Sequence, residues 1–222
     1  MTTFVLIPGA GGVAWYWHLV AERLAEAGHE AIPVDLPGDD GSAGLPEYAE
    51  LVLEAIGERD EAVLVAQSLG GFTAPLVATR ASLAGLVFVN AMVPKPGERP
   101  GEWWGNTGSE PARRAAAERD GYSPEFDLFT YFLHDVPLHV AAEGEPHQRE
   151  EADAAFASVC GFEAWPAIPI RAVAGADDRF FPVDFQRALA HDRLGIEADV
   201  LPGGHLIALS QPDALTRYLL TR

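Results

Sequence analysis

The chain has 222 residues, of which 48% are hydrophobic and 22% charged, a composition typical of a single globular domain with a substantial core. Its formal net charge of −18 at pH 7 repels phosphate backbones and anionic lipid surfaces, so we expect no nucleic-acid partner and no membrane partner. No apolar run approaches the roughly 20 residues of a membrane helix. The N-terminus also lacks the basic region of a signal peptide, and we expect a cytoplasmic protein.

The first 90 residues alternate short apolar runs with longer segments of helical periodicity. Gly28 follows the first of these helical segments directly, which is typical of a helix end. In chain order, the pattern predicts a strand at 4–8, a helix at 15–27, a strand at 31–34, a helix at 46–59, a strand at 62–66, a helix at 70–80 and a strand at 86–90.

Residues 92–169 interrupt this alternation. The interval is rich in proline and glycine at its start and then carries helical pieces with many aromatic residues, which argue against disorder. A stretch this long between two sheet strands is usually functional. We predict a helical cap over the carboxyl ends of the strands, where ligands bind in open α/β sheets. Most of its aromatic residues are expected to pack the cap onto the body, and the candidates for lining a substrate pocket are Trp103, Trp104, Phe129 and Phe132.

The alternation resumes after the cap, with a strand at 170–174, a helix at 183–194, a strand at 199–201 and a helix at about 213–220. Continuous apolar strands such as 63–66 suit a sheet that is buried on both faces, and alternation with helices makes such a sheet parallel. The predicted fold is therefore α/β, with a doubly wound, mostly parallel sheet of about six strands. Residues 1–91 and 170–222 form its core, and residues 92–169 form the inserted cap.

The single cysteine, Cys160, excludes an intramolecular disulfide and any metal site built from several cysteines. It lies in the sequence SVCGF, which has no recognisable catalytic context. We interpret it as a buried structural thiol.

The strongest local signal is AVLVAQSLGG at residues 62–71. An apolar strand ends, Ser68 follows, and small residues open a helix, which matches the G-x-S-x-G turn with Ala66 in place of its first glycine. Small neighbours are needed because the serine of that turn occupies a strained position that exposes its hydroxyl. A helix N-terminus also favours developing negative charge. The run predicts Ser68 as a nucleophile, and a plain N-cap serine is the alternative.

Further motifs accompany this turn: LIPGAGGVAW at 6–15, GH at 28–29, DLPG at 35–38, GADDRFFP at 175–182 and GGH at 203–205. With these motifs the chain resembles the α/β-hydrolase superfamily, and within it the compact branch of bacterial esterases, plant methylesterases and hydroxynitrile lyases. The resemblance covers both flanks of the cap and nearly the full sheet. Relative to larger members, the chain lacks the first two strands. The resemblance implies a serine hydrolase that needs no cofactor.

The order Ser, Asp, His along the chain is the order expected for that fold. Among the seven histidines, His205 alone lies in a Gly-Gly-His turn between the last strand and the last helix, where it can accept the proton of Ser68. The other six are interpreted as surface or packing histidines. The family places the acid three residues after the glycine of the GADD motif, which implies Asp178 and leaves the adjacent Asp177 as the alternative.

An oxyanion requires two preorganised N–H donors. We expect them from Leu69, the residue after the nucleophile, and from Ala10, in a glycine-rich loop whose backbone can approach the substrate closely. This loop lacks the full G-x-G-x-x-G spacing of a dinucleotide site. Most relatives begin the loop with His-Gly where this chain has Pro8-Gly9. The family histidine mainly organises the loop, so this departure bears on the geometry of the loop more than on catalysis.

The predicted reaction is acyl transfer from an ester or lactone of a small to medium, largely apolar substrate. One alternative is a carbon–carbon lyase of the hydroxynitrile-lyase type. Those lyases carry Thr and Lys at the positions of Gly9 and Leu206, which favours hydrolysis here. The other is a binding protein that retains the fold without catalysis.

Partners and cofactors follow from the same patterns. No histidine, cysteine or carboxylate cluster has the spacing of metal ligands, so we expect no metal and no cofactor. The expected partner is a small-molecule substrate. Whether two copies of the chain form a homodimer stays open.

Overall fold

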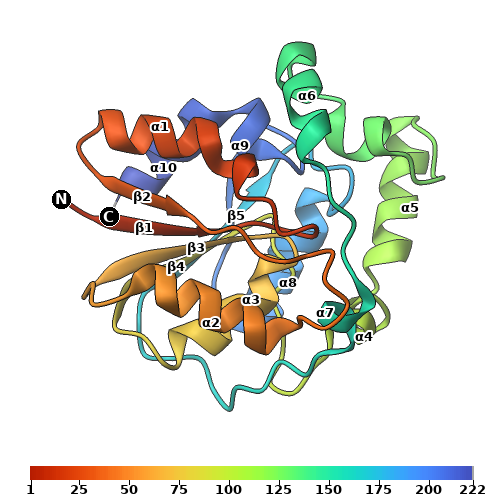
Figure 1. The fold of residues 1–222 in the computed structure, drawn as a ribbon. Coiled ribbons are helices and arrows are strands. Elements are labelled where there is room, and N and C mark those ends of the chain that lie inside the picture. Colours follow the sequence, from red (N-terminus) through yellow and green to blue (C-terminus); the bar gives the residue numbers. More distant parts are fainter. Residues whose placement is uncertain (222) are drawn as a thin grey trace.

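A parallel sheet organises residues 1–221, which are the residues described by this computed structural model (Figure 1). Its strands are β1 (Thr3–Ile7), β2 (Glu30–Pro33), β3 (Ala62–Gln67), β4 (Leu83–Val89), β5 (Ile170–Gly175) and β6 (Asp199–Leu201). The strand order is β2-β1-β3-β4-β5-β6, and every neighbouring pair is parallel. The chain passes from β1 to the edge strand β2 and then back across β1 to β3, so the sheet is doubly wound. The predicted α/β fold with about six parallel strands is confirmed.

Helices cover both faces of the sheet (Figure 1). One face carries the 3₁₀ helix η1 (Ala14–Trp17), α1 (His18–Glu26), α9 (Ile207–Ser210) and α10 (Pro212–Leu220). The other face carries α2 (Leu45–Ile56), α3 (Gly70–Ala78) and α8 (Val183–Leu194). Between β4 and β5 the chain forms α4 (Pro100–Thr107), α5 (Ser109–Asp120), the π-helix η2 (Phe129–Leu133), α6 (Leu138–Gly144), the 3₁₀ helix η3 (Glu145–His147) and α7 (Asp153–Ala157).

Strand β3 shows why the sheet forms from these residues. Leu64 and Ala66 pack with the α2, α3 and α8 side of the molecule, whereas Val65 packs with the α1 and α10 side, and all three are fully buried. Successive side chains of a strand point to opposite faces, so a continuous apolar run suits a sheet that is covered on both. Each fully buried Leu or Val side chain contributes roughly 1.5–3 kcal/mol.

Two element ends differ from the prediction for local reasons. The predicted helix at 46–59 ends at Ile56, because Gly57 turns to a φ of +57°. The strand predicted from residue 86 begins three positions earlier, because Leu83 already pairs with Ala62 of β3. The pattern underestimated this strand since glycine, a weak strand former, lies at its third position.

Much of the segment 92–169, including α5 and α6, lies at the end of the sheet away from the N-terminus (Figure 1). Its last residues return to the opposite end of the sheet, where the Pro169 carbonyl accepts from the Leu86 N–H at 2.9 Å just before β5 begins. Part of it belongs to the main core, because Trp103, Ala155 and Cys160 are fully buried in one cluster with side chains of α2 and α3. Its division from the rest of the chain as a separate cap therefore stays a prediction. Across residues 1–221, no helix has both the length and the apolar character needed to cross a bilayer.

Candidate active site

Ser68 occupies a tight turn between β3 and α3. Its φ of +48° lies in the left-handed region, which is strained for a residue with a side chain. Two hydrogen bonds to the end of β4 and the residues after it hold this turn. The Ser68 N–H donates to the Val89 carbonyl at 3.3 Å, and the Met92 N–H donates to the Ser68 carbonyl at 2.9 Å. Gly70 permits the turn because a Cβ there would lie 2.5 Å from the carbonyl oxygen of Pro8. The turn thus needs small residues, as the sequence pattern indicated.

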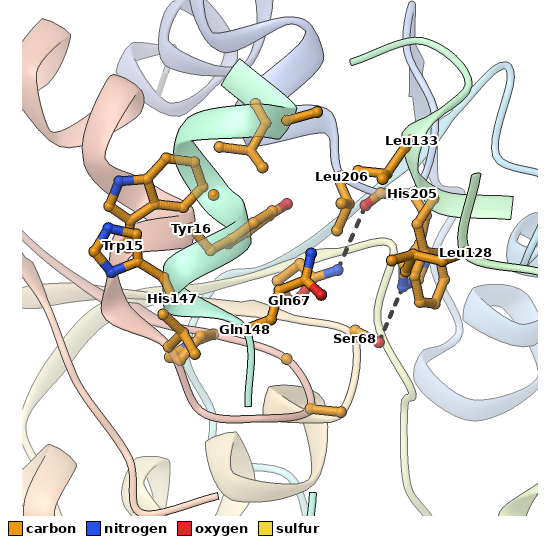
Figure 2. A pocket seen from close by; sticks show the side chains of 18 of the residues that line it. Trp15, Tyr16, Gln67, Ser68, Leu128, Leu133, His147, Gln148, His205 and Leu206 are labelled. Atoms are coloured by element: carbon orange, nitrogen blue, oxygen red, sulfur yellow. Dashed lines mark hydrogen bonds between the residues drawn. The ribbon is translucent and has the colours of Figure 1, made fainter. Parts of the chain in front are cut away.

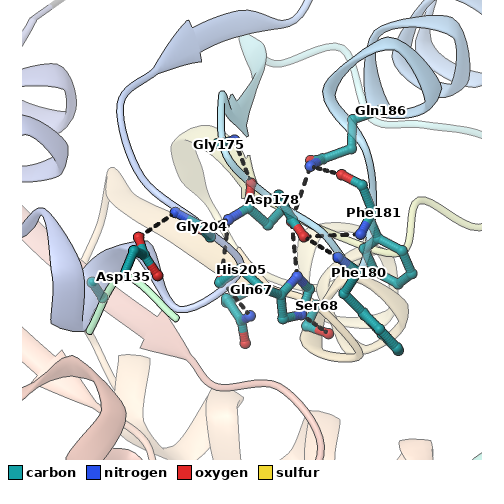
Figure 3. A network of polar contacts seen from close by, with 12 residues as sticks. Gln67, Ser68, Asp135, Gly175, Asp178, Phe180, Phe181, Gln186, Gly204 and His205 are labelled. Atoms are coloured by element: carbon teal, nitrogen blue, oxygen red, sulfur yellow. Dashed lines mark hydrogen bonds and ion pairs between the residues drawn. The ribbon is translucent and has the colours of Figure 1, made fainter. Parts of the chain in front are cut away.

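His205 and Asp178 complete a hydrogen-bonded series with Ser68 (Figure 3). His205 Nε2 lies 3.1 Å from Ser68 Oγ, and His205 Nδ1 lies 2.9 Å from Asp178 Oδ2. A carboxylate can only accept, so Nδ1 carries the proton of the neutral imidazole and Nε2 is free to accept from the serine hydroxyl. All three residues are buried. The structure therefore brings the three predicted side chains together in one hydrogen-bonded series.

The adjacent acids Asp177 and Asp178 lie in different environments. Asp178 is 4% exposed, and its Oδ1 accepts from the N–H groups of Phe180 and Phe181 at 2.8 and 2.9 Å. Its Oδ2 also accepts from Gln186 Nε2 at 3.1 Å, so the carboxylate is fixed in orientation. Asp177 is exposed, and among the described residues 1–221 its side chain accepts only from the N–H of Gly203, at 3.3 Å. The geometry favours Asp178 as the partner of the imidazole.

Asn90, which the sequence analysis missed, holds the turn that carries His205. It is fully buried, directly after β4, with a φ of +46°. Its Nδ2 donates to the carbonyls of Gly204 and His205 at 2.9 and 3.1 Å, and its Oδ1 accepts from the Gly175 N–H at 2.7 Å. One amide thus joins β4, the end of β5 and the histidine turn. An asparagine after an apolar strand is the only local signal, since this residue type tolerates left-handed backbone better than most.

The 92–169 segment also contacts the histidine directly. Phe132 stacks on the His205 ring, with 4.9 Å between centroids and 19° between planes. The Gly204 N–H donates to Asp135 Oδ2 at 2.6 Å (Figure 3). Phe180 and Phe181 make T-shaped contacts with the imidazole, with 5.1 Å between ring centroids in each case. The imidazole is therefore held by three aromatic rings, and its turn is held by a hydrogen bond to the backbone of Gly204.

The two predicted oxyanion donors, Ala10 and Leu69, both lie in turns near Ser68. Leu69 is the buried residue between Ser68 and α3, and Ala10 is exposed in the loop after β1. Both residues lie outside helices and strands, and within residues 1–221 neither backbone N–H donates a hydrogen bond to the chain. Both amides are thus free to bind a substrate oxygen.

Glu151 anchors the loop that carries Ala10. One of its carboxylate oxygens accepts from the Gly11 N–H at 2.6 Å, and the other accepts from the Tyr48 hydroxyl at 2.6 Å. Burial raises the pKa of the Glu151 carboxyl above its ordinary value, although both hydrogen bonds act in the opposite direction. Arg149 adds a second tie, because its guanidinium donates to the Gly12 carbonyl at 3.1 Å. These contacts organise the loop that follows Pro8.

A cavity of about 320 Å³ opens above Ser68 and His205 (Figure 2). Its walls are mainly apolar, and most of them come from η1, from residues 128–149 and from the turn after His205. Trp15 lies at one side of the cavity between two histidines, 4.4 Å from the ring centroid of His18 and 5.2 Å from that of His147. The polar residues of the lining are Tyr16, Gln67, His147, Gln148 and Arg149, together with Ser68 and His205.

Three of the four predicted pocket aromatics do not line this cavity. Trp103 is fully buried beneath Phe181, and its indole N–H donates to the Val93 carbonyl at 3.0 Å. Trp104 packs against Phe180 and borders a different hollow, and Phe129 points outward with 59% of its surface exposed. Their prediction as pocket residues was wrong, because an aromatic residue serves equally well as core packing.

The fourth candidate, Phe132, does line the cavity. A histidine interpreted as a packing or surface residue, His147, also lines it and stacks on Trp15. Trp15 ends the LIPGAGGVAW motif, but no pattern in the sequence assigned Trp15, Tyr16 or His147 to the pocket, since each lies on a segment that only the folded chain brings near Ser68.

Two further expectations concern metals and the cysteine. Within residues 1–221, no cluster of three or more His, Cys, Asp or Glu side chains is placed to hold a metal ion. Cys160 is a free, fully buried thiol whose Sγ donates to the Phe72 carbonyl at 3.2 Å. Burial raises the pKa of this thiol to about 12, so it is the inert structural cysteine that the sequence predicted.

Comparison with known proteins places these features in a wider group. A model of the alpha/beta hydrolase family matches residues 4–217. The chain is similar to Methylesterase 7 of Arabidopsis thaliana, with 25% identity over 252 residues that cover 98% of this chain and 94% of that protein. It is similar in structure to polyneuridine aldehyde esterase, with a TM-score of 0.79 at 20% identity, covering 99% of this chain and 98% of the other. A pyrethroid hydrolase from Sphingobium faniae JZ-2 has a TM-score of 0.77 at 21% identity, covering 98% and 95%.

Proposed function

The chain belongs to the alpha/beta hydrolase family, and from that premise we propose that it is a serine esterase. It cleaves a carboxylic ester or lactone of a small to medium, largely apolar substrate through an acyl-enzyme on Ser68. The names of similar proteins support ester cleavage, since a methylesterase, polyneuridine aldehyde esterase and a pyrethroid hydrolase are among them. The substrate class is supported by the mainly apolar cavity of about 320 Å³.

In the proposed mechanism, Ser68 Oγ attacks the carbonyl carbon while His205 Nε2 removes its proton. The negative charge on the carbonyl oxygen is stabilised by the N–H groups of Ala10 and Leu69. His205 then returns the proton to the leaving alcohol, and a water molecule hydrolyses the acyl-enzyme by the same steps. Asp178 keeps the imidazole in the required tautomer and stabilises its charged form.

The observation that carries this proposal is the pair of contacts made by one imidazole. His205 lies 3.1 Å from the hydroxyl of Ser68 and 2.9 Å from the carboxylate of Asp178, directly beneath a cavity that can hold a substrate. A packing histidine would not need a serine held at a φ of +48° as its second partner. Such strain is retained where it serves a reaction.

The test combines active-site labelling with a panel of esters and lactones. A fluorophosphonate probe should label the wild-type protein, and the Ser68→Ala variant should not be labelled. The same variant should lose hydrolysis across the panel, while retaining the melting temperature of a folded protein. Cys160→Ser is the matched control, because this buried residue lies outside the cavity and its replacement should leave labelling intact.

Two results would overturn the proposal. Absence of labelling in the folded wild-type protein would favour a binding protein that retains the fold. Release of aldehyde and cyanide from mandelonitrile, without turnover of any ester, would favour a carbon–carbon lyase.

A further inference from the structure

Tyr16 is a buried tyrosine on η1 whose hydroxyl opens into the cavity above Ser68. The residue is only 8% exposed and belongs to the cavity lining. In Figure 2 its oxygen is directed into the pocket, toward the side of Gln67 and Leu206 and away from Trp15. The mechanism proposed above gives this hydroxyl no role.

The hydrogen bonds of this hydroxyl are incomplete. Its oxygen accepts one long bond, from the Ala208 N–H at 3.4 Å. Across the described residues 1–221, no group is placed to accept the hydroxyl proton. A buried donor without a partner costs free energy, and a ligand that supplies an acceptor recovers it. The phenol is therefore a donor that points at the substrate space.

The surroundings restrict which acceptor this donor can serve. Burial raises the pKa of the Tyr16 hydroxyl well above its ordinary value, and the negative charges of Asp178 and Asp135 raise it further, so the phenol stays neutral. The same charges oppose a carboxylate or phosphate beside it. The cationic side chain of the lining, Arg149, is already paired with Asp35 at 2.8 Å. An uncharged acceptor fits best.

Building on the esterase function proposed above, we propose that Tyr16 determines substrate specificity by donating a hydrogen bond to an uncharged oxygen of the substrate. This oxygen is a ketone, an ether or a hydroxyl that lies apart from the ester being cleaved. The preferred substrates are accordingly oxygenated esters or lactones rather than plain hydrocarbon esters. Their remaining carbon atoms pack against the apolar walls formed by Leu133, Val140 and Leu209.

The experiment is an ether scan of two model esters. In p-nitrophenyl heptanoate one ether oxygen replaces each methylene of the acyl chain from C3 to C6 in turn, and in heptyl butanoate it replaces each methylene of the alcohol from C3 to C6, so that every compound keeps its ester group and gains one ether. For each compound we compare kcat/KM with that of the parent ester, in the wild type and in Tyr16→Phe. At one or two positions, the wild-type preference for the ether should fall by about threefold to tenfold in Tyr16→Phe.

Two controls accompany the scan. The parent ester corrects for any general effect of the substitution, including loss of the weak bond to Ala208, and a thermal melt verifies that the variant is folded. Tyr218→Phe is the matched tyrosine control, because its hydroxyl bonds Asp199 at the surface, away from the cavity. This variant should reproduce the wild-type preferences at every position.

The outcomes separate this inference from the esterase proposal. If every ether position responds identically in wild type and Tyr16→Phe, the role of Tyr16 is refuted while esterase activity stands. If the wild type hydrolyses none of these esters, binding decides instead: calorimetry compares ether and parent esters in Ser68→Ala with and without Tyr16→Phe. A preference for an ether that disappears with Tyr16→Phe supports the role of Tyr16, and equal dissociation constants refute it.

Discussion

The side-chain amide of Asn90 donates a hydrogen bond to the backbone carbonyl of His205 across 3.1 Å, although 115 positions separate the two residues. The same amide also bonds Gly204 and Gly175, so it fixes the histidine turn against the strand end that precedes Asp178. We interpret Asn90 as a positioning residue, since it does not line the cavity and acts through His205.

Asn90→Gly tests this interpretation without adding backbone strain, because glycine accepts the φ of +46°. We expect kcat to fall by about 10- to 100-fold, with little change in KM, and the free energy of unfolding to fall by about 2–4 kcal/mol. Steady-state kinetics and urea unfolding measure the two effects. A folded variant whose kcat stays within twofold of the wild type would contradict a positioning role.

The two adjacent acids give a matched pair of variants. Asp178→Asn should lower kcat by about 10⁴-fold, because an amide next to Nδ1 favours the wrong imidazole tautomer. Asp177→Asn should change kcat only slightly, since this exposed carboxylate contacts the turn rather than the imidazole. Measured on the same ester, equal losses in the two variants would reverse the assignment.

Asp135 provides a test of the contact between the 92–169 segment and the histidine turn. Asp135→Ala removes the acceptor of the Gly204 N–H and should lower kcat by about tenfold. Asp135→Asn keeps an oxygen at that position and should retain most of the wild-type kcat. Identical kcat values for the alanine and asparagine variants would show that this hydrogen bond does not support the base.

Glu151 predicts a pH dependence of stability. Its pKa is raised above the ordinary value of 4.5 because burial opposes the charged form, so the folded state binds the proton more tightly than the unfolded state. The stability contributed by the protonated carboxyl is complete below pH 4.5 and is lost as the pH rises through the raised pKa. The Glu151→Gln variant carries no titrating group at this position, so its stability does not fall in this way as the pH rises.

The advantage in unfolding free energy of the wild type over Glu151→Gln should therefore shrink as the pH rises above about 4.5. Urea unfolding of both proteins from pH 4 to 8 measures the difference. A constant difference across this range would show that the carboxyl does not titrate there, and a growing one would reverse the sign of its pKa shift.

The buried thiol of Cys160 should be unreactive toward alkylating reagents in the folded protein. With its pKa raised to about 12 and its surface fully buried, the thiol should react with iodoacetamide at pH 8 only after unfolding. Mass spectrometry before and after addition of urea measures the fraction of the protein that carries the label. Rapid labelling of the native protein would contradict the burial of this residue.

The sheet was predictable because its signal is local. Continuous apolar runs such as 63–66 identify a strand that is buried on both faces, and the order of strands and helices along the chain indicates a parallel sheet. Ser68 and His205 could be picked out from the sequence in the same way. Each lies in a short motif whose neighbouring residues must be small for steric reasons. These motifs depend on residues within a few positions of one another.

The remaining parts of the site depend on distant residues, and the sequence did not reveal them. Asp135 meets Gly204 across 69 positions, and Glu151 meets Gly11 across 140. Neither acid differs in its local pattern from the other acids of a strongly acidic chain. Trp103 was instead assigned to the pocket by mistake. The aromatic composition of its segment suggested a ligand-binding surface, but its surroundings in the folded chain make it a core residue.

The contacts of Asp135 and Glu151 have a consequence for protein engineering. The 92–169 segment lines the pocket and also bonds the turn of His205 at Gly204 and the glycine-rich loop at Gly11. Under the proposed function, selectivity and chemistry are therefore not separable modules in this molecule. A chimera that received the corresponding segment of another hydrolase would need to retain acceptors at both anchor points. Otherwise the transplant would loosen the reacting groups while leaving the sheet beneath them intact.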